Sequence, residues 1–495
     1  MNHCIAFRRP RSVLRAQVLI ALALAASLAN ADPDPARTET ILSPEATSDS
    51  RFGAAVAGGD FDGDGVVDLA IGDPFEHPLS GPVRGMVRTF HRTPFGWESR
   101  HLADLNNLAA RFGATLAFAD FDEDGRQDLL IGAPRNDDSP GIVYLLRHTA
   151  PNVTSYGQLA GTYAARCGSS LAVGDFNDDG HMDFATGCPE ESVGGDLGAG
   201  EVKIGYGEGT GAFFWGVLNQ DTGGVAGSAE VGDGFGSSLA SGDFNCDGIS
   251  DLAVGVPREG TNGALRAGVV QVFHGATNGM PGGGNQLWDQ EATGTESVSG
   301  EGDLFGHALA AGGFDNNVFE DCDDLAVGIP YDAGSSAGTV VVIEGSPGGL
   351  TPLGARRITR FDFVGVANAP GVQRLGLSLL AAELGRGAQD DLVLGLPGEP
   401  ALLPLPPNPP VDSPGVVCIA YGGSGSGVFA QGAQCISATD ISESVAADLD
   451  FGLELAAVAP PGESAADLAI GLPASEQVLL LRNTLFRDGF DGELD

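Results

Sequence analysis

The sequence has few positive charges for its length. It carries 25 Lys and Arg against 66 Asp and Glu in 495 residues, a formal net charge of −41. Because contacts with phosphate backbones need clustered cations, this balance argues against nucleic acid as a partner. The acidic residues are either a solvated surface that keeps the protein soluble or ligands for metal ions, and their positions decide between the two.

Long apolar runs are almost absent as well. The exception is residues 16–28, which follow four arginines and precede Ala-Asn-Ala at 29–31. A basic segment, a short apolar segment and an A-x-A cleavage site together predict a signal peptide over residues 1–31, and the Arg8-Arg9 pair leaves a twin-arginine export route open. No later segment is long and apolar enough to span a membrane. We expect a secreted or cell-surface protein, with the periplasm as an alternative.

Cysteine is scarce, and six of the seven cysteines remain after removal of the signal peptide. An even number in an oxidising compartment predicts disulfides rather than catalytic thiols, although six cysteines allow 15 pairings. We favour one bond within a repeat, one across a hairpin and, from what remains, one between neighbouring loops: Cys167–Cys188, Cys418–Cys435 and Cys246–Cys322. Free buried cysteines are the alternative.

The sequence is rich in one feature, an internal repeat. The phrase RFGAAVAGGDFDGDGVVDLAIGDP around Phe52 returns around Phe112 as RFGATLAFADFDEDGRQDLLIGAP. Further copies, at intervals of 55 to 76 residues, begin at Cys167, Phe235, Phe305, Leu375 and Phe451. Regular recurrence of one unit indicates a repeat architecture such as a solenoid or a propeller.

Each copy contains four stretches of β character. In the first copy they are residues 54–57, 68–72, 85–90 and 97–103. The second stretch is apolar throughout, which is typical of a strand covered on both faces, and the proline that follows it ends the strand. Propeller blades stack face to face and cover their inner strands in this way. The sequence therefore predicts an all-β, seven-bladed β-propeller over residues 32–485, followed by a short tail at 486–495.

The two ends of the repeat region complement each other. The seventh copy reaches its third strand at residues 477–482 and then lacks a fourth, whereas residues 38–44 precede the first copy and are similar to an outer strand. We predict that residues 38–44 complete the last blade. This N-terminal strand would close the ring and remove the open edges between the first and last blades.

The phrase, its order and its number resemble the FG-GAP repeats that form the blades of the integrin α-subunit head. Residues 131–134 even contain the Gly-Ala-Pro of that motif. The resemblance covers residues 38–484 and implies a propeller with an adhesion function. It is confined to the head, because the leg domains, the membrane-spanning helix and the inserted ligand-binding domain of that family have no counterpart in the sequence.

An acidic nine-residue loop separates the first two strands of each repeat, as in DFDGDGVVD from Asp60 to Asp68. Side-chain oxygens at positions 1, 3, 5 and 9 and the carbonyl of position 7 can surround one hard cation, while glycine at position 6 permits the turn, as in the EF-hand loop. The resemblance implies the same roles in integrin-type blades. Four copies keep the pattern, and we predict four Ca²⁺ sites with these ligands: Asp60, Asp62, Asp64, Val66 and Asp68; Asp120, Asp122, Asp124, Arg126 and Asp128; Asp175, Asn177, Asp179, His181 and Asp183; Asp243, Asn245, Asp247, Ile249 and Asp251.

The other three loops depart from the pattern. The fifth has an insertion and leaves Asp315, Asn317 and Asp324 as an incomplete set for a fifth site, while the sixth and seventh have too few ligands. For the four good loops the alternative is an acidic turn without metal. Crowding carboxylates within ~4–5 Å costs a few kcal/mol per pair at an effective dielectric near 20, and a divalent cation turns that repulsion into attraction.

No catalytic set is recognisable in the sequence. The seven histidines of the mature chain occupy different positions in the repeat, and neither a G-x-S-x-G elbow nor a phosphate-binding loop occurs. We therefore predict that the chain is not an enzyme but a monomeric binding or adhesion module for an extracellular protein or glycan. Two alternatives stay open: a hydrolase of glycans or phosphoesters with a site on the propeller face, and a structural envelope component.

Two segments do not fit the repeat. Residues 397–414 are rich in proline and should be extended and exposed, as a partner-binding loop or as a plain surface excursion. Residues 486–491 are similar to short aromatic and acidic endings of some exported bacterial proteins. They are a sorting signal or a disordered terminus.

Overall fold

The computed structural model describes the repeat region with gaps. The described residues are 38–44, 50–75, 85–93, 96–102, 111–134, 141–149, 152–156, 165–210, 213–280, 284–295, 297–314, 322–332, 338–363, 374–385, 389–397, 415–423, 433–437, 450–458 and 465–482. The predicted signal peptide, nearly all of the proline-rich insertion and the C-terminal tail lie outside them.

Seven four-stranded antiparallel sheets form the fold, and we number them as blades along the chain. Blade 1 contains β2 (Ala55–Gly59), β3 (Asp68–Asp73), β4 (Met86–Thr93) and β5 (Gly96–Leu102). Blade 2 contains β6 (Thr115–Ala119), β7 (Asp128–Ala133), β8 (Ile142–Thr149) and β9 (Asn152–Tyr156). Blade 3 contains β10 (Ser170–Gly174), β11 (Asp183–Cys188), β12 (Glu201–Gly207) and β13 (Phe213–Leu218). Blade 4 contains β14 (Ser238–Gly242), β15 (Asp251–Val256), β16 (Val269–Phe273) and β17 (Gln286–Trp288).

The remaining blades follow the same order. Blade 5 contains β18 (Leu309–Gly312), β19 (Asp324–Ile329), β20 (Thr339–Glu344) and β21 (Thr351–Thr359), after which comes the 3₁₀ turn η2 (Arg360–Asp362). Blade 6 contains β22 (Ser378–Ala382), β23 (Asp391–Leu396), β24 (Val416–Ala420) and β25 (Gln434–Ser437). Blade 7 contains β26 (Glu454–Val458), β27 (Asp467–Leu472) and β28 (Gln477–Leu481), and its fourth strand is β1 (Thr38–Leu42). The prediction of a seven-bladed all-β propeller is confirmed.

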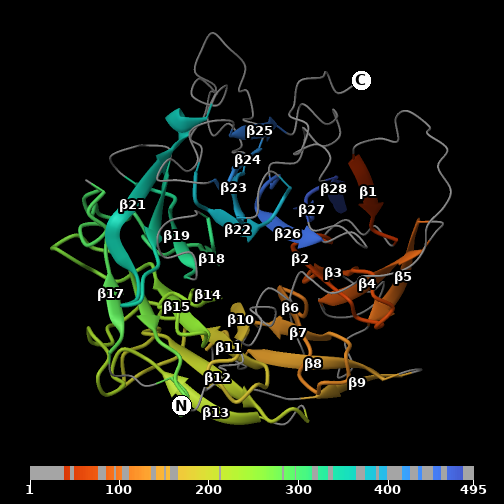
Figure 1. The fold of residues 1–495 in the computed structure, drawn as a ribbon, viewed down its shortest axis with the longest axis horizontal. Coiled ribbons are helices and arrows are strands. Elements are labelled where there is room, and N and C mark those ends of the chain that lie inside the picture. Colours follow the sequence, from red (N-terminus) through yellow and green to blue (C-terminus); the bar gives the residue numbers. More distant parts are fainter. Residues whose placement is uncertain are drawn as a thin grey trace, which may run out of the picture.

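The ring closes through the N-terminal strand. β1 pairs antiparallel with β28, with Thr38 opposite Leu481 and Leu42 opposite Gln477, so the predicted closure is also confirmed. Figure 1 shows β1 beside β28 at the outer end of the last blade. Ile41 of β1 is 5% exposed and packs in a cluster that combines residues of blades 7 and 1. Closure thus buries apolar surface as well as pairing a strand edge.

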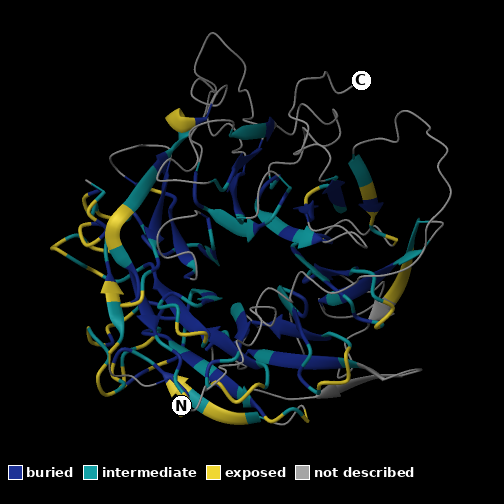
Figure 2. Cartoon of the chain, in the orientation of Figure 1, coloured by how far each residue is buried: buried dark blue, intermediate teal, exposed yellow. Residues whose placement is uncertain are grey.

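The apolar core lies between neighbouring blades. The first strand of each blade lies nearest the centre of the ring in Figure 1, and the second strands are buried along their whole length. Figure 2 shows that exposed residues collect on outer strands such as β13 and β21 and in loops. A cluster shared by blades 1 and 2 includes Phe61, Val87, Phe112 and Ile131. The Phe of each Phe-Gly pair therefore acts as a wedge between two blades.

The second-strand glycine of one repeat meets the first glycine of the next repeat across the blade boundary. A Cβ on Gly72, in the second strand of blade 1, would overlap the carbonyl oxygen of Gly113, the glycine of the next Phe-Gly pair. The same relationship joins Gly132 with Gly168, Gly187 with Gly236, Gly255 with Gly306, Gly328 with Gly376 and Gly395 with Gly452. The repeat needs both glycines because any side chain would force neighbouring blades apart.

Three disulfides are present, and they pair the cysteines as the sequence favoured. They are Cys167–Cys188 within blade 3, Cys418–Cys435 across β24 and β25, and Cys246–Cys322 between the acidic loops of blades 4 and 5. Within the described residues, no helix has both the length and the apolar character needed to cross a membrane.

Candidate metal-binding loops

The acidic loops that join the first and second strands of blades 1 to 4 share one backbone arrangement. The carboxylate at position 1 caps the turn: Asp60 Oδ1 accepts the N–H groups of Gly63 at 2.8 Å and Asp64 at 3.1 Å, and Asp60 Oδ2 accepts the N–H of Gly65 at 2.9 Å. The bond to the glycine at position 6 recurs in loops 2, 3 and 4, at 3.0, 3.0 and 2.8 Å. Position 6 has a positive φ in each loop, which glycine adopts without strain.

The carboxylate at position 5 also has one constant role. It accepts the N–H of position 7 in all four loops. Val66 donates to Asp64 at 2.8 Å, and Arg126 to Asp124, His181 to Asp179 and Ile249 to Asp247 at 2.9 Å each. This bond fixes the backbone of position 7, whose carbonyl oxygen is one of the ligands predicted from the sequence. The loops are therefore ordered by their own side chains at the positions expected of a cation cage.

Carboxylate oxygens gather closely in the first two loops. One oxygen from each of Asp60, Asp62 and Asp64 lies within 4.8 Å of the others, and the same holds for Asp120, Asp122 and Asp128. In loops 3 and 4 position 3 is asparagine, and its side-chain oxygen accepts the N–H of position 5 at 3.1 Å in loop 3 and 2.9 Å in loop 4. Clusters of hard oxygen atoms on a short loop could hold a divalent metal ion.

The aspartate at position 9 accepts backbone hydrogen bonds both in blades with the cation pattern and in a blade without it. All seven are buried: Asp68, Asp128, Asp183, Asp251, Asp324, Asp391 and Asp467. Asp183 accepts the N–H of Phe176 at position 2 and the N–H of Gly207 after the third strand, both at 2.8 Å. Asp391 makes the equivalent bonds to Leu384 and Gly422 at 3.0 and 2.9 Å although its loop has lost the cation pattern. Position 9 thus serves the blade independently of metal, a role that the sequence analysis missed.

The fifth loop is described only in part. Asp324 accepts the N–H of Phe314 at 3.3 Å and that of Gly345 at 2.9 Å, as its equivalents do. Asp315 and Asn317 lie outside the described residues.

Burial dominates the electrostatics of these loops. It raises the pKa of Asp128 and of Asp183 to about 7, with smaller contributions from neighbouring carboxylates. The pKa of Asp243 is likewise raised to about 7, mainly by burial. Charged carboxylates are therefore unfavourable here without a positive partner, and a divalent cation would supply one.

Basic side chains from the third strands reach the loops, which the sequence analysis did not foresee. His91 Nδ1 lies 3.0 Å from Asp62 Oδ2 and 3.1 Å from Asp68 Oδ1. Arg147 Nη1 lies 3.2 Å from Asp122 Oδ2. His274 Nδ1 lies 3.0 Å from Asp251 Oδ2. The expectation that the histidines occupy different positions in the repeat is therefore wrong for His91 and His274, which each lie beside the position 9 aspartate of their blade.

The pairing of the second and third strands explains these contacts. Phe90 is paired with Leu69 and Phe273 with Leu252, so the next residue along each third strand faces the position 9 aspartate. These basic groups partly neutralise the loops, and a bound cation would have to displace them from the carboxylates.

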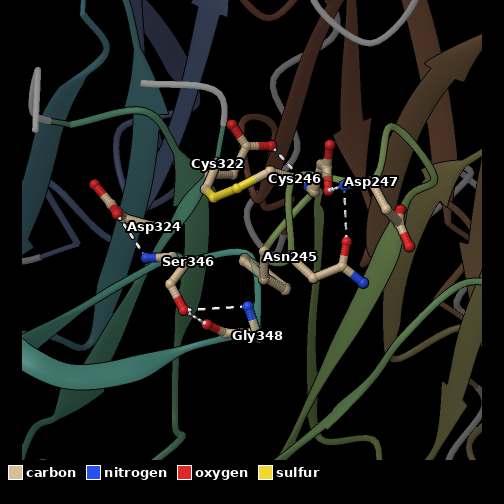
Figure 3. Close-up of a disulfide and its surroundings, with 12 residues drawn as sticks. Asn245, Cys246, Asp247, Cys322, Asp324, Ser346 and Gly348 are labelled. Atoms are coloured by element: carbon tan, nitrogen blue, oxygen red, sulfur yellow. Dashed lines mark hydrogen bonds between the residues drawn. A yellow bond between two sulfur atoms is a disulfide. The ribbon is translucent and has the colours of Figure 1, made fainter. Parts of the chain in front are cut away.

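Neighbouring loops are also linked to each other. Asp175 at position 1 donates its N–H to Ser250 Oγ at 3.1 Å, and the N–H of Ser250 returns a bond to the Asp175 carbonyl at 3.0 Å. The same two-way bracket joins Asp60 with Gln127, Asp243 with Asp323 and Gly313 with Asp390. Figure 3 shows the covalent version, in which the Cys246–Cys322 disulfide lies between Asp247 of loop 4 and Asp324 of blade 5. Glu123 of loop 2 also contacts His181 of loop 3, so the loops of blades 1 to 6 form a connected belt.

Comparison with known proteins identifies the repeats. The FG-GAP repeat model matches residues 52–87, 112–146, 168–204 and 235–273, within blades 1 to 4. The chain is an integrin-α-like FG-GAP repeat protein. It is 34% identical over 230 residues to integrin alpha pat-2 of Caenorhabditis briggsae, which covers 44% of this chain and 18% of that protein. It is 31% identical over 244 residues to integrin alpha-8 of Mus musculus, covering 47% of this chain and 22% of that protein.

A second group of relatives shares the repeats. The FG-GAP chain is 38% identical over 135 residues to phosphatidylinositol-glycan-specific phospholipase D of Rattus norvegicus, which covers 27% of this chain and 16% of that protein. The alignments thus span about a fifth of the length of these relatives or less.

Solved structures with a similar shape correct one prediction. They include the GH93 α-L-arabinofuranosidase of Fusarium graminearum, with a TM-score of 0.45, 11% identity and coverage of 78% of this chain and 98% of that one. The Penicillium chrysogenum α-L-arabinanase has a TM-score of 0.42 and 12% identity, with coverage of 74% of this chain and 94% of that one. These neighbours are glycoside hydrolases, and the prediction that the FG-GAP chain is not an enzyme is withdrawn. Similarity at this level does not carry their activity over to it.

Proposed function

We propose that this FG-GAP chain is an extracellular calcium-binding propeller that acts as a binding or adhesion module for a protein or glycan. The observation that carries the proposal is the arrangement common to the four loops of blades 1 to 4, in which the carboxylate at position 1 accepts the N–H of position 6 and the carboxylate at position 5 accepts the N–H of position 7. The FG-GAP repeat model matches these same four blades, and the similarity to integrin α subunits supports the proposal.

Calcium is the cation that fits the donors best. The ligand sets consist of carboxylate, amide and carbonyl oxygens on nine-residue loops, without sulfur, and such sets favour hard cations. Extracellular calcium modules have dissociation constants of roughly 10⁻⁴–10⁻³ M, so ambient calcium fills them. We propose four sites, with the ligands predicted from the sequence, and leave the partly described fifth loop outside the count.

The role of calcium in this proposal is to stiffen the belt of loops. A cation bound in one loop orders positions 1 to 9, and the brackets between position 1 and the next loop pass that order to the neighbouring blade. A rigid propeller presents its surface loops to a ligand at low entropic cost. The three disulfides are consistent with an extracellular location.

A binding screen tests the function. The calcium-loaded chain is applied to a glycan array and to extracellular matrix proteins, with and without chelator. We expect retention on one ligand class that is lost on chelation and recovered when calcium is restored. Retention unaffected by chelation would contradict the coupling of calcium to binding, and cleavage of an arrayed glycan in place of retention would identify a hydrolase.

A further inference from the structure

A second cluster of carboxylates lies away from the acidic loops. One oxygen from each of Glu230, Asp233 and Glu259 lies within 4.8 Å of the others. Glu230 and Asp233 belong to the connection from β13 to β14, and Glu259 belongs to the connection from β15 to β16. Because successive strands are antiparallel, these connections lie at the opposite end of the blades from the loops between first and second strands.

The backbone around this cluster is tied down by its own groups. Asp233 Oδ2 accepts the N–H of Glu230 at 2.7 Å, and the Asp233 carbonyl accepts the N–H of Arg258 at 3.3 Å. The carbonyl of Glu259 accepts the N–H of Gly268 at 3.0 Å. The backbone segments that carry the three carboxylates are thus fixed by hydrogen bonds.

A buried amide points to a missing partner. Gln220 is 3% exposed, and its Nε2 donates to Glu259 Oε2 at 2.7 Å. Its Oε1 has no hydrogen-bond donor among the residues that the structure describes. A buried acceptor without a donor is unfavourable, and a cation beside the three carboxylates would satisfy it.

The next blade provides an internal comparison. Residues 218–236 and 288–306 are equivalent connections of the same length, each leading to a Phe-Gly pair, and Gln290 corresponds to Gln220. Gln290 has partners on both atoms: its Nε2 donates to Asp303 Oδ2 at 2.8 Å, and its Oε1 accepts from Ser297 Oγ at 2.9 Å. In the earlier connection glycine at 227 replaces that serine, which leaves the Gln220 oxygen without its donor.

The same comparison shows which residue gives the earlier connection its extra negative charge. Gly300 stands at the position of Glu230, so the later connection lacks one of the three carboxylates. The equivalent of Glu259 in blade 5 is Asp332, which pairs with Thr339 and Arg357. Among the described residues no ion pair within 4.0 Å joins Arg258 to the three carboxylates. The loss of a hydroxyl donor therefore coincides with the gain of one acid, Glu230, and with the loss of the arginine partner that the equivalent of Glu259 has in blade 5.

We propose that these three carboxylates, together with the Gln220 amide oxygen, bind one divalent cation at the face opposite the acidic loops. All donors are hard oxygens, so the cation is Ca²⁺. The cation gives the Gln220 amide oxygen a partner and offsets the repulsion among the three carboxylates. Glu230 is exposed, so the site opens to solvent on that side. A bound cation would hold the connection between blades 3 and 4 against the adjoining loop of blade 4. The site does not depend on calcium in the acidic loops.

Counting bound calcium tests this site. The mature chain and its Glu230→Gln and Glu259→Gln variants are dialysed to equilibrium against millimolar calcium, and the bound ions per chain are measured. We expect each variant to hold one ion fewer than the parent. Glu301→Gln, which removes an exposed acid from the later connection, is the matched control and should keep the parent count. An unchanged count in Glu230→Gln, whose exposed side chain can be replaced without unfolding the chain, would overturn the proposal.

A variant with altered acidic loops distinguishes calcium bound at this site from calcium bound in those loops. A variant carrying Asn at the four position 5 aspartates, namely Asp64, Asp124, Asp179 and Asp247, should retain one ion, and adding Glu230→Gln should remove it. If the four-Asn variant retains no ion while the parent binds four or more, the new site is disproved and the loop sites stand. If the parent holds one ion that only Glu230→Gln removes, the new site stands and the loop sites fail.

Discussion

The carbonyl oxygen of Gly53, in the first Phe-Gly pair, occupies the place that a Cβ on Gly471 would need. The two residues belong to the first and last repeats, and their contact is the closing member of the seven glycine pairs around the ring. Gly53 has φ +94°, so it also adopts a conformation that other residues rarely take.

Gly471→Ala should therefore destabilise the closed ring. Overpacking against a backbone atom cannot be relieved by a side-chain rotation, and we expect a loss of about 1–3 kcal/mol or more in the free energy of unfolding. Urea unfolding followed by circular dichroism measures it. Gly223→Ala is the control, because a Cβ there meets nothing within 4 Å. Equal stabilities for the two variants would contradict this packing.

Removal of β1 should open the ring. A chain lacking residues 32–46 loses the ladder between β1 and β28 and the burial of Ile41, which alone contributes roughly 1.5–3 kcal/mol. We expect a lower melting temperature, and a synthetic peptide of residues 36–46 added in trans should restore much of it. Melting that is unchanged by the deletion would show that the N-terminal strand does not hold the propeller closed.

Chelation should lower stability through the acidic loops. Millimolar calcium is roughly one to ten times the dissociation constants expected of such sites, so each site stabilises the fold by about 0.4–1.4 kcal/mol, and removal of calcium from four sites should shift the melting curve markedly. Asp179→Asn, which removes a carboxylate that also holds His181, should reduce the shift. Glu301→Asn, at an exposed position outside the loops, should leave the shift unchanged.

Stability without calcium should fall as pH rises from 4 to about 7. Burial raises the pKa of Asp128 and of Asp183 to about 7, above the value of about 3.9 in unfolded chains. Their contribution is fully present below the unfolded pKa and is lost as pH rises through the folded pKa, because the folded state then loses its excess bound protons. Calcium should remove their share of this decline by binding the ionised carboxylates. Melting temperatures in chelator and in calcium across this range check the sign.

Asp391 supplies the internal control for that experiment. Burial raises its pKa to about 7 as well, yet its loop lacks the cation pattern. Asp391→Asn should reduce the dependence of stability on pH equally with and without calcium. A calcium-dependent effect of this substitution would contradict a purely structural role for position 9 in blade 6.

The fold was predictable from the repeat because each physical requirement recurs in the sequence. The buried second strands, the paired glycines and the unmatched strand before Phe52 together specify the blades, their number and the closure. The acidic loops were also recognisable, since the spacing of their residues is local, and their role as calcium ligands stays a prediction. What escaped prediction depends on pairing between distant segments. His91 and Arg147 reach the loops from the third strands, and Gln127 and Ser250 bracket loops of the preceding blade. The cluster around Glu259 escaped for the same reason, because it joins two connections that meet only in the folded ring.

The number of calcium ions bound to the folded chain tests the central claim most directly. The secreted chain is purified, dialysed against millimolar calcium and analysed for metal, with folding verified by circular dichroism. We predict at least four calcium ions per chain, and a loss of about one ion for each acidic loop whose position 5 aspartate is replaced by asparagine. A folded chain that carries no calcium under these conditions would contradict it.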